Sequence, residues 1–418
     1  MTIPLPILSA LTAIDLSVLD WRELSEDPWF VGLVAAFVSL VANAEFYRRF
    51  WVSIRSAPRL DAIEDEVDSF PTISVVIPAY NEAANITDCL TAILENEWAG
   101  FEKIQVLVAD DESTDETAIL AKRVAEKDER VSVFAVPPRP TDRAWRGKNW
   151  ACAQAAKRAT GEYLLFVDAD VRLERGGIAR ALANAQRYKS DLLSCAPKIV
   201  CGCFSEWLIQ PIMATLIAVG FSFEGVNDPK KVNKAAAAGP FMLFRRAAYE
   251  QIGTHAAVAT DPVEDFALAN LVKQSGLALR YVIGLDVARV RMYRSFGDLW
   301  EGWTKNFHLA GGRNVFLTVA SAAAVALIFV VPWVGVLMGG VGVWMRQPWA
   351  GWFALLAGLA VAVQLWGRIM SARIVAQPPR YVWLGWLGGG IISAICLVSM
   401  IKTETGWGWT WRGRSLAG

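Results

Sequence analysis

Long apolar runs near both ends of the chain constrain its fold more than any other feature. The run from Pro28 to Tyr47 can cross a bilayer as a helix, because about 20 residues at a rise of 1.5 Å cover a hydrocarbon core of roughly 30 Å. Three further runs fill the last quarter of the chain, at Val315 to Val343, Trp349 to Trp366 and Tyr381 to Ile401. We therefore expect an integral membrane protein.

Charges beside the first run predict its orientation. Acidic residues dominate before it and basic residues follow it: Asp15, Asp20, Glu23, Glu26 and Asp27, against Arg22, come first, and Arg48, Arg49, Arg55 and Arg59 come after. By the positive-inside rule, the region that follows the helix lies in the cytosol. The charge order and the late start of the run argue against a cleaved signal peptide.

The number of C-terminal spans stays open at this stage. Arg368, Arg373 and Arg380 form a basic connection between the last two runs, but Lys402, Arg412 and Arg414 then fall on the opposite side if all three runs cross. One run is therefore a candidate for a re-entrant or interfacial segment. We predict an N-terminal segment at 1–60 with one span at about 28–47, a cytosolic domain at 71–306, and a membrane region at 315–418 with two or three spans.

Composition excludes several functional classes. The chain of 418 residues has 41 Lys and Arg against 41 Asp and Glu, so no excess of positive charge points to a nucleic-acid partner. Hydrophobic residues make up 54% of the chain and 19 residues are Trp, which suits membrane segments with interfacial aromatics. The six Cys have no CxxC spacing and only two His are present, so we expect thiols in a core in a reducing compartment rather than a zinc cluster or a disulfide framework.

The region from about Pro71 to Arg313 alternates strand-like and helix-length segments, which predicts a doubly wound α/β domain. The predicted strands are Ile73 to Ile77, Ile104 to Ala109, Val131 to Ala135 and Tyr163 to Val167. The predicted helices are Asn81 to Glu95, Thr114 to Lys127 and Gly147 to Ala159. Ligands of such sheets bind beyond the carboxyl ends of the strands, so polar residues at these ends are candidates for the functional site.

Two strand ends carry candidate nucleotide-binding residues. The first strand runs into Pro78-Ala79-Tyr80-Asn81-Glu82, where an ordinary turn with Asn81 as helix N-cap is an equally good reading. The second runs into the acidic segment from Asp110 to Asp115, and a carboxylate there can accept hydrogen bonds from a uracil imide or from ribose hydroxyls. No GxGxxG follows any of these strands, which argues against a dinucleotide dehydrogenase.

The fourth strand ends in Val167-Asp168-Ala169-Asp170. Two carboxylates in this spacing can bind one divalent cation, with diphosphate oxygens completing its shell. An Asp-x-Asp alone is a weak motif that often occurs by chance, but this one closes a buried strand in the same fold pattern as the acidic segment.

Two later segments complete the set of candidates. Ala235 to Ala238 lead into a segment from Gly239 to Arg246, where small residues open a predicted strand and let a substrate approach the backbone closely, although a plain buried strand explains them at least as well. Glu264 and Asp265 stand at the start of a predicted helix, a place that also favours acids for electrostatic reasons. As a general base, one of them has to lie within hydrogen-bond reach of an acceptor hydroxyl.

Taken in order, these motifs and the Gly147-Lys148 turn resemble glycosyltransferase family 2, whose fold is called GT-A, over about Thr72 to Asn306. The resemblance implies a divalent cofactor, Mg²⁺ or Mn²⁺, and a nucleotide diphosphate sugar as donor, with a UDP-sugar the leading choice. It implies roles residue by residue: Pro78, Tyr80, Glu82, Asp111, Lys148 and Asp168 on the side of the nucleotide sugar, Asp168 and Asp170 for the metal, and Asp265 beside Glu264 for the catalytic base.

One departure from the family pattern bears on the product. Many membrane members carry a Gln/Arg-x-x-Arg-Trp motif, whereas this chain has Leu299-Trp300-Glu301-Gly302-Trp303 and keeps only the Trp. This argues against processive polymer synthesis. Gly239, Trp303 and Lys305 are expected on the side of the acceptor and the diphosphate, and Lys305 or Arg313 is the candidate for the missing positive charge.

The order of a leading helix, a cytosolic domain and a trailing membrane block is similar to members that glycosylate lipids, such as the ceramide, carotenoid and hopanoid-associated enzymes. The weakly charged run from Phe204 to Phe223 reads as an interfacial helix that guides the acceptor, or as a buried core helix. The resemblance thus predicts an inverting transfer of a hexose to a hydroxyl of a carotenoid, a hopanoid-like alcohol or a glycerolipid.

The alternative function is a polysaccharide synthase or a translocation protein that moves a glycan or glycolipid across the membrane. Polar residues inside the spans would mark such a path. Only Asn43, Glu45 and Gln364 stand out there. The sequence leaves the sugar and the lipid open.

Overall fold

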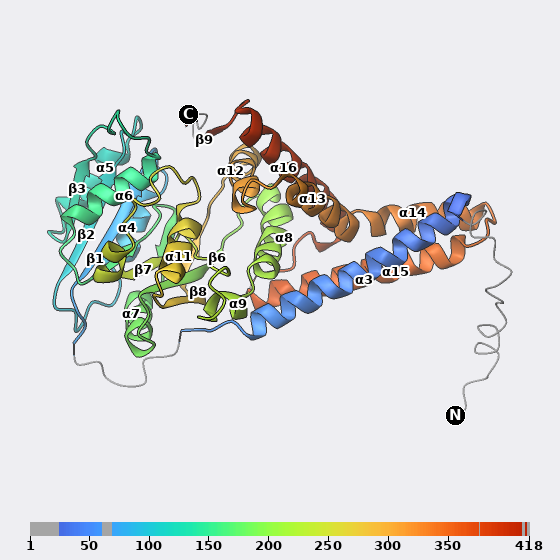
Figure 1. Cartoon of the computed structure of the whole chain (residues 1–418), viewed down its shortest axis with the longest axis horizontal. Coiled ribbons are helices and arrows are strands. Elements are labelled where there is room, and N and C mark those ends of the chain that lie inside the picture. The colour runs from blue at the N-terminus through green and yellow to red at the C-terminus, as the bar shows by residue number, and fades with distance from the viewer. Residues whose placement is uncertain (1–24, 61–68, 376, 412–413, 416–418) are drawn as a thin grey trace.

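The computed structural model describes residues 25–60, 69–375, 377–411 and 414–415. An α/β domain forms one end of the molecule and long apolar helices extend from it to the other (Figure 1). The predicted acidic residues Asp15, Asp20 and Glu23 lie outside the described residues, as do Arg412 and residues 416–418 of the predicted membrane region.

An eight-stranded mixed sheet forms the centre of the α/β domain, in the order β3-β2-β1-β4-β7-β6-β8-β5. Strands β3, β2, β1 and β4 are parallel to one another, and β7 runs antiparallel between β4 and β6. The strands are β1 (Ile73–Ala79), β2 (Ile104–Asp110), β3 (Val131–Ala135), β4 (Tyr163–Phe166), β5 (Val171–Leu173), β6 (Leu192–Ile199), β7 (Met242–Arg245) and β8 (Leu279–Val290). Each of the four predicted strands begins at the predicted residue, and the predicted fold class is confirmed.

Helices cover both faces of this sheet because alternate strand residues are apolar on both sides. Val75 and Ile77 of β1 pack toward α4 (Ile86–Leu94), α5 (Thr117–Ala125) and α7 (Gly177–Arg187). Val76, on the opposite face, packs toward α6 (Gly147–Arg158), α10 (Arg246–Gln251) and α11 (Glu264–Gln274). Five of the six Cys are buried and all are free thiols, as their spacing predicts.

Two predicted helix starts are wrong. The helix predicted from Asn81 begins at Ile86, because Asn81 has a φ of 52° and residues 83–85 form a turn before the helix. Side chains of the acidic segment hold this turn: Ser113 Oγ accepts from the Asn81 amide at 3.0 Å and Asp115 accepts from the Ala83 amide at 3.1 Å. The helix predicted from Thr114 begins at Thr117, because the N–H of Thr114 donates to Asn81 Oδ1 at 2.8 Å and that of Thr117 to Asp115 Oδ1 at 3.0 Å. Asn81 does not cap α4, whose N-cap is Asn85.

Within the part of the chain that the structure describes, three helices are long and apolar enough to cross a membrane: α3 (Pro28–Arg55), α15 (Ala350–Ile374) and α16 (Gly385–Thr405), the last together with the 3₁₀ turn η2 (Val382–Leu384). Large apolar side chains on them face outward, such as Phe37 at 56% and Leu355 at 50% exposed. Exposed apolar surface of this extent indicates membrane association. A short two-stranded sheet, β9 (Thr410–Trp411) and β10 (Arg414–Ser415), follows α16.

The run predicted at Val315 to Val343 forms two helices, α13 (Val315–Phe329) and α14 (Val331–Trp344), bent by 48°. Pro332 explains the break, because proline has no N–H to bond the carbonyl four residues earlier, that of Ile328. Asn43 and Gln364 donate to this carbonyl instead, at 3.0 and 2.8 Å. This pair is either one broken span or a re-entrant segment, as the charge pattern left open.

Helix α8 (Phe204–Gly220) lies between the α/β domain and the apolar helices (Figure 1). Its Leu208 and Ile212 pack with Phe46 of α3 and Ile392 of α16, so one of its faces is core. The other face lines the cavity described below. Short α9 (Phe223–Asn227) and amphipathic α12 (Phe296–Ala310) complete the connection between the two regions.

Candidate active site

Three parallel strands bring polar residues to one edge of the sheet. Ala79, the last residue of β1, is in register with Asp110, the last residue of β2, and β4 ends on the other side of β1. The chain leaves β1 toward β2 on one side and returns to β4 on the other, which makes the crevice between β1 and β4 the place where such sheets bind ligands. Tyr80 and Asp111 follow the first two strands directly.

The end of β2 is held rigidly beside the end of β1. The backbone N–H of Asp111 donates to the carbonyl of Ala79 at 2.8 Å, and the Asp111 side chain is buried. Arg139, from the loop after β3, lies 4.0 Å from the Asp111 carboxylate and 3.5 Å from that of Glu112. The carboxylate of Glu82, predicted to bind the nucleotide sugar, accepts a hydrogen bond from Asn85 at 2.9 Å.

Lys148 connects the end of β4 with the start of α11. Its Nζ lies 2.6 Å from Asp168 Oδ1 and 2.7 Å from Glu264 Oε1. Burial lowers the pKa of Lys148, but the two carboxylates outweigh it and raise this pKa well above its ordinary value. Burial raises the pKa of Glu264, and the charge and hydrogen bond of Lys148 reverse this, so the Glu264 carboxyl is held ionised.

Asp265 lies next to Glu264 in the chain but in a different environment. Its two oxygens accept from the backbone N–H groups of Gly239 and Phe266, each at 2.9 Å, and it forms no ion pair with Lys148. Burial and then repulsion by Glu264 raise the pKa of Asp265 to about 7. A carboxyl group with such a pKa is matched to proton transfer near neutral pH.

The approach to α11 is fixed by Asn149 of α6. Its amide donates to the carbonyls of Val258 and Asp261, at 2.6 and 2.9 Å, and so holds the loop that precedes Glu264 and Asp265. Since Lys148 is the neighbouring residue, α6 positions both the Lys148 ammonium and the loop that leads to its partner Glu264. Asn149 was not a candidate from the sequence, because a lone Asn in a helix carries no motif.

Helix α12 supplies the other wall. Trp303 donates through its indole N–H to the side-chain oxygen of Gln210 on α8 at 2.8 Å, which ties the two helices together. Burial lowers the pKa of Lys305 to about 8, although Glu264 opposes the effect. Arg313, the other candidate for the missing positive charge, pairs with Glu404 at 3.1 Å and is not among the cavity-lining residues, which favours Lys305.

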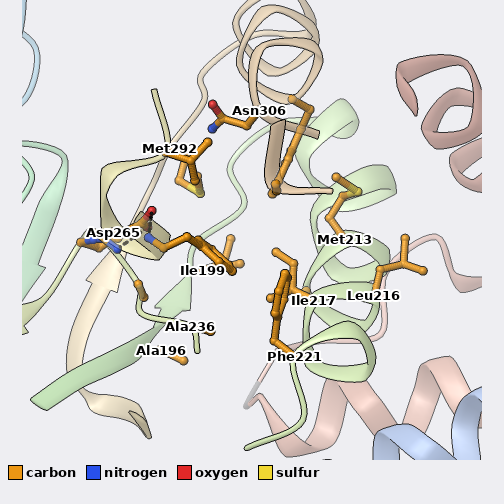
Figure 2. A pocket seen from close by; sticks show the side chains of 18 of the residues that line it. Ala196, Ile199, Met213, Leu216, Ile217, Phe221, Ala236, Asp265, Met292 and Asn306 are labelled. Atoms are coloured by element: carbon orange, nitrogen blue, oxygen red, sulfur yellow. Dashed lines mark hydrogen bonds between the residues drawn. The ribbon is translucent and has the colours of Figure 1, made fainter. Parts of the chain in front are cut away.

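A single cavity of about 1310 Å³ brings all the predicted site residues together. These residues are Pro78, Tyr80, Glu82, Asp111, Lys148, Asp168, Asp170, Gly239, Glu264, Asp265, Trp303 and Lys305. The cavity continues beyond them between α8, α3, α13 and the end of α15. Figure 2 shows Asp265 on one side of this space, and Met213, Leu216 and Ile217 of α8 on the other.

Sequence reasoning pointed to the run from Phe204 to Phe223, which forms α8, but it missed the contribution of α13 to the apolar half of this cavity and two polar residues, Arg139 and Gln210. The cavity-lining side chains of α8 and α13, such as Ile217 and Val325, look like ordinary apolar helix residues along the chain. A clue to the polar residues was Gln210, whose side chain interrupts the apolar stretch between Trp207 and Thr215.

The sheet order and the acidic strand ends define a domain of the GT-A class of glycosyltransferases. Residues 74–253 match the family model described as Glycosyl transferase family 2. The chain therefore contains a glycosyl transferase family 2 domain, which confirms the resemblance read from its motifs.

Relatives from several Staphylococcus aureus strains carry the name 4,4'-diaponeurosporenoate glycosyltransferase. The protein of Staphylococcus aureus strain MRSA252 is 30% identical over 260 residues, which is 62% of this chain and 66% of that protein. The protein of strain USA300 is 31% identical over 245 residues, 58% of this chain and 62% of that protein. The chain thus matches slightly less than two thirds of the length of these relatives.

One solved structure resembles nearly the whole chain. It is the mannosyltransferase PcManGT from Pyrobaculum calidifontis, in complex with GDP-Man and Mn²⁺, with a TM-score of 0.53 at 18% identity. The alignment covers 91% of this chain and 99% of that one, so the similarity of fold extends beyond the α/β domain.

Proposed function

We propose that this protein is an inverting glycosyltransferase that moves a hexose from a UDP-sugar to a hydroxyl group of a membrane lipid. The observation that carries the proposal is the cavity, which joins the carboxylates at the strand ends to apolar side chains of α8 and α13. A polar donor and an apolar acceptor can meet only in a site with both kinds of wall. In this cavity the two kinds of wall meet beside Asp265.

On the donor side, we propose that Tyr80 and Asp111 bind the base, with Pro78 and Glu82 beside them, and that Lys148 faces the diphosphate. Asp168 and Asp170 would hold a divalent cation, Mg²⁺ or Mn²⁺. Oxygen donors suit these cations, and Mg²⁺ commonly takes one or two carboxylates and completes its shell with substrate phosphates. No group of three or more His, Cys, Asp or Glu side chains able to hold a metal occurs among the described residues, so we expect substrate oxygens in the shell. When bound, such an ion stabilises negative charge on the departing nucleotide diphosphate.

On the acceptor side, Asp265 acts as the general base. It takes the proton of the acceptor hydroxyl, whose oxygen bonds to the anomeric carbon as the bond to the diphosphate breaks on the opposite face. The configuration at that carbon is therefore inverted. The raised pKa of Asp265 and its position on the cavity wall support this role.

The leading acceptors are a carotenoid, a hopanoid-like alcohol and a glycerolipid, and the names of the two relatives favour a carotenoid. Those names also support a second candidate, since the ending of diaponeurosporenoate denotes a carboxylate. A carboxylate is already ionised at neutral pH and needs no base. The product would then be a glycosyl ester rather than a glycoside.

The test uses the full-length protein in detergent with UDP-sugars, Mn²⁺ or Mg²⁺, and either a lipid alcohol or a lipid carboxylic acid. Acceptor-dependent release of UDP and a glycosylated lipid in mass spectra are the expected results. Transfer to the alcohol that is lost in Asp265→Asn supports the hydroxyl reaction, whereas transfer to the acid that survives in Asp265→Asn identifies the carboxylate reaction. Absence of acceptor-dependent UDP release with every donor and lipid would refute both.

We also propose that the catalytic domain lies in the cytosol, on the side of the basic residues that end α3, such as Arg48 and Arg55. Labelling of engineered surface cysteines in intact cells and in inverted vesicles tests this placement. Labelling of the domain from outside intact cells would contradict it.

The alternative translocation function has less support. Two of the three polar residues that stand out in the predicted apolar runs, Asn43 and Gln364, donate to the Ile328 carbonyl freed at the α13–α14 break. The third, Glu45, pairs with Arg48 and Arg49 at 2.6 and 2.7 Å. Structural partners therefore account for all three residues without a transport path.

A further inference from the structure

Lys273, near the end of α11, is a buried cation that the proposed reaction does not use. Its Nζ lies 2.8 to 2.9 Å from the backbone carbonyls of Val226, Asp228, Lys231 and Lys234, and 3.5 Å from that of Gly225. Within the described residues, Lys273 forms no ion pair with a carboxylate. Its direct partners are therefore carbonyl dipoles, and the Asp228 carboxylate adds a favourable charge interaction without a direct ion pair.

The number of carbonyls exceeds what hydrogen bonding requires. A lysine ammonium has three N–H donors, yet five carbonyl oxygens surround this one. Some of these carbonyls belong to the last turn of α9, where helix carbonyls lack internal partners and attract positive charge. The side chains of the neighbouring lysines Lys230 and Lys231 are exposed, so the ammonium inside the cage is that of Lys273.

The caged segment leads directly to the active site. Residues 236–238, a few positions further along, line the cavity, and the N–H of Gly239 donates to Asp265. Since α11 carries Asp265 in its first turn and Lys273 in its last, the helix holds the segment from Gly225 to Gly239 at two points. Besides the cage, the hydrogen bond between Gly239 and Asp265 and the apolar cluster that Ala235 and Ala237 share with Leu268 of α11 hold the segment against the helix.

We propose that Lys273 is a positioning residue. Its ammonium occupies a cage of backbone carbonyls, in the way a bound monovalent cation would, and thereby holds the segment at 225–239 against α11. The proposal rests on the proposed glycosyl transfer only for its activity readout. Removal of the cation should release the segment and misplace Gly239 relative to Asp265.

Limited proteolysis tests the release without reference to activity. Trypsin cleaves after Lys231 and Lys234, and we expect Lys273→Met and Lys273→Ala to be cut there at least about tenfold faster than the wild type, because local opening controls cleavage. Lys127→Met, an exposed lysine on the far side of the sheet, serves as the matched control with unchanged cleavage. Unchanged cleavage of both Lys273 variants would overturn the proposal.

Chemical rescue tests the cage itself. Lys273→Ala leaves room for a small cation, so K⁺ or methylammonium should restore resistance to trypsin, whereas choline at the same ionic strength should not. Lys273→Met fills the space and should respond to neither. Equal protection by choline would overturn the cage. If the alanine variant does not fold, Lys273→Gln replaces it, and full resistance to trypsin in this neutral variant would likewise refute a need for positive charge.

In the transfer assay, we expect Lys273→Met to lower kcat by about 10- to 100-fold with little change in the KM for the donor, because a misplacement of about 1 Å has effects of this size. The loss of the Gly239 hydrogen bond also raises the pKa of Asp265, so the acid limb of the pH profile should move to higher pH. A wild-type pH profile and kcat in this variant would contradict the positioning role. If no transfer activity is found for the wild type, the trypsin and rescue experiments still decide the proposal.

Discussion

Replacement of Asp265 by Asn is the sharpest test of the proposed chemistry. The change removes the base and keeps the shape of the side chain. General bases contribute about 10²- to 10⁴-fold to rate, and we expect a loss of this size in kcat with a lipid alcohol. Binding of the UDP-sugar should change by less than about twofold, because Lys148 pairs with Asp168 and Glu264 and not with Asp265.

The variant should remain folded, because two effects on stability oppose each other. The amide group of Asn leaves the N–H of Gly239 or Phe266 without its acceptor, at a cost of about 1–3 kcal/mol. Against this, Asp265 has its pKa raised from 3.8 to about 7, and ionising it in the folded protein costs on the order of 4 kcal/mol at high pH. This cost is absent below pH 4, grows between pH 4 and 7, and is complete above 7. Asp265→Asn should therefore be at least as stable as the wild type at pH 8.

The pH profile follows from the same pKa. For the wild type, about a tenth of Asp265 is ionised at pH 6 and about nine tenths at pH 8, so kcat/KM should fall tenfold for each pH unit well below 7. The assay is UDP release with a lipid alcohol from pH 5.5 to 8.5, alongside a melting curve. Asp286→Asn, at an exposed carboxylate paired with Arg180, is the matched control and should retain wild-type activity. A stable Asp265→Asn protein with more than a tenth of the wild-type rate on an alcohol would refute the role of Asp265.

Three further changes probe other parts of the cavity. Gly239→Ala places a Cβ 3.2 Å from Asp265 Oδ2 and 3.3 Å from Lys148 Nζ, so we expect kcat to fall by at least about tenfold in a folded protein, as checked by initial rates and circular dichroism. Ile217→Trp should fill the apolar part of the cavity and raise the KM for long-chain lipids while calorimetric binding of the UDP-sugar stays unchanged; equal effects on donor and acceptor would contradict an acceptor site there. Asp170→Asn should weaken Mn²⁺ binding in the presence of UDP by about 10- to 100-fold, measured by electron paramagnetic resonance, and wild-type affinity would remove Asp170 as a ligand.

Much of the fold was predictable because its causes are local in the sequence. The apolar runs specify helices such as α3 and α15 by length and composition, and the four parallel strands begin at the predicted residues. The helix starts were wrong where side chains from another segment decided the local conformation. Ser113 and Asp115 hold the turn after β1 from more than thirty positions away, and no propensity of Asn81 itself could reveal this.

The sequence by itself determined which residue types stand at the strand ends and, through their order, the family of the domain. Only the tertiary structure decided the surroundings of each carboxylate and therefore its pKa. Glu264 and Asp265 are adjacent in the chain, yet the ammonium of Lys148 keeps one ionised while burial and repulsion raise the pKa of the other to about 7. The same holds for the cavity that joins these acids to α8 and α13 and for the carbonyl cage of Lys273. The physical reason is that charge interactions, burial and cavity shape depend on distances through space, and these are set only when segments far apart in the chain pack together.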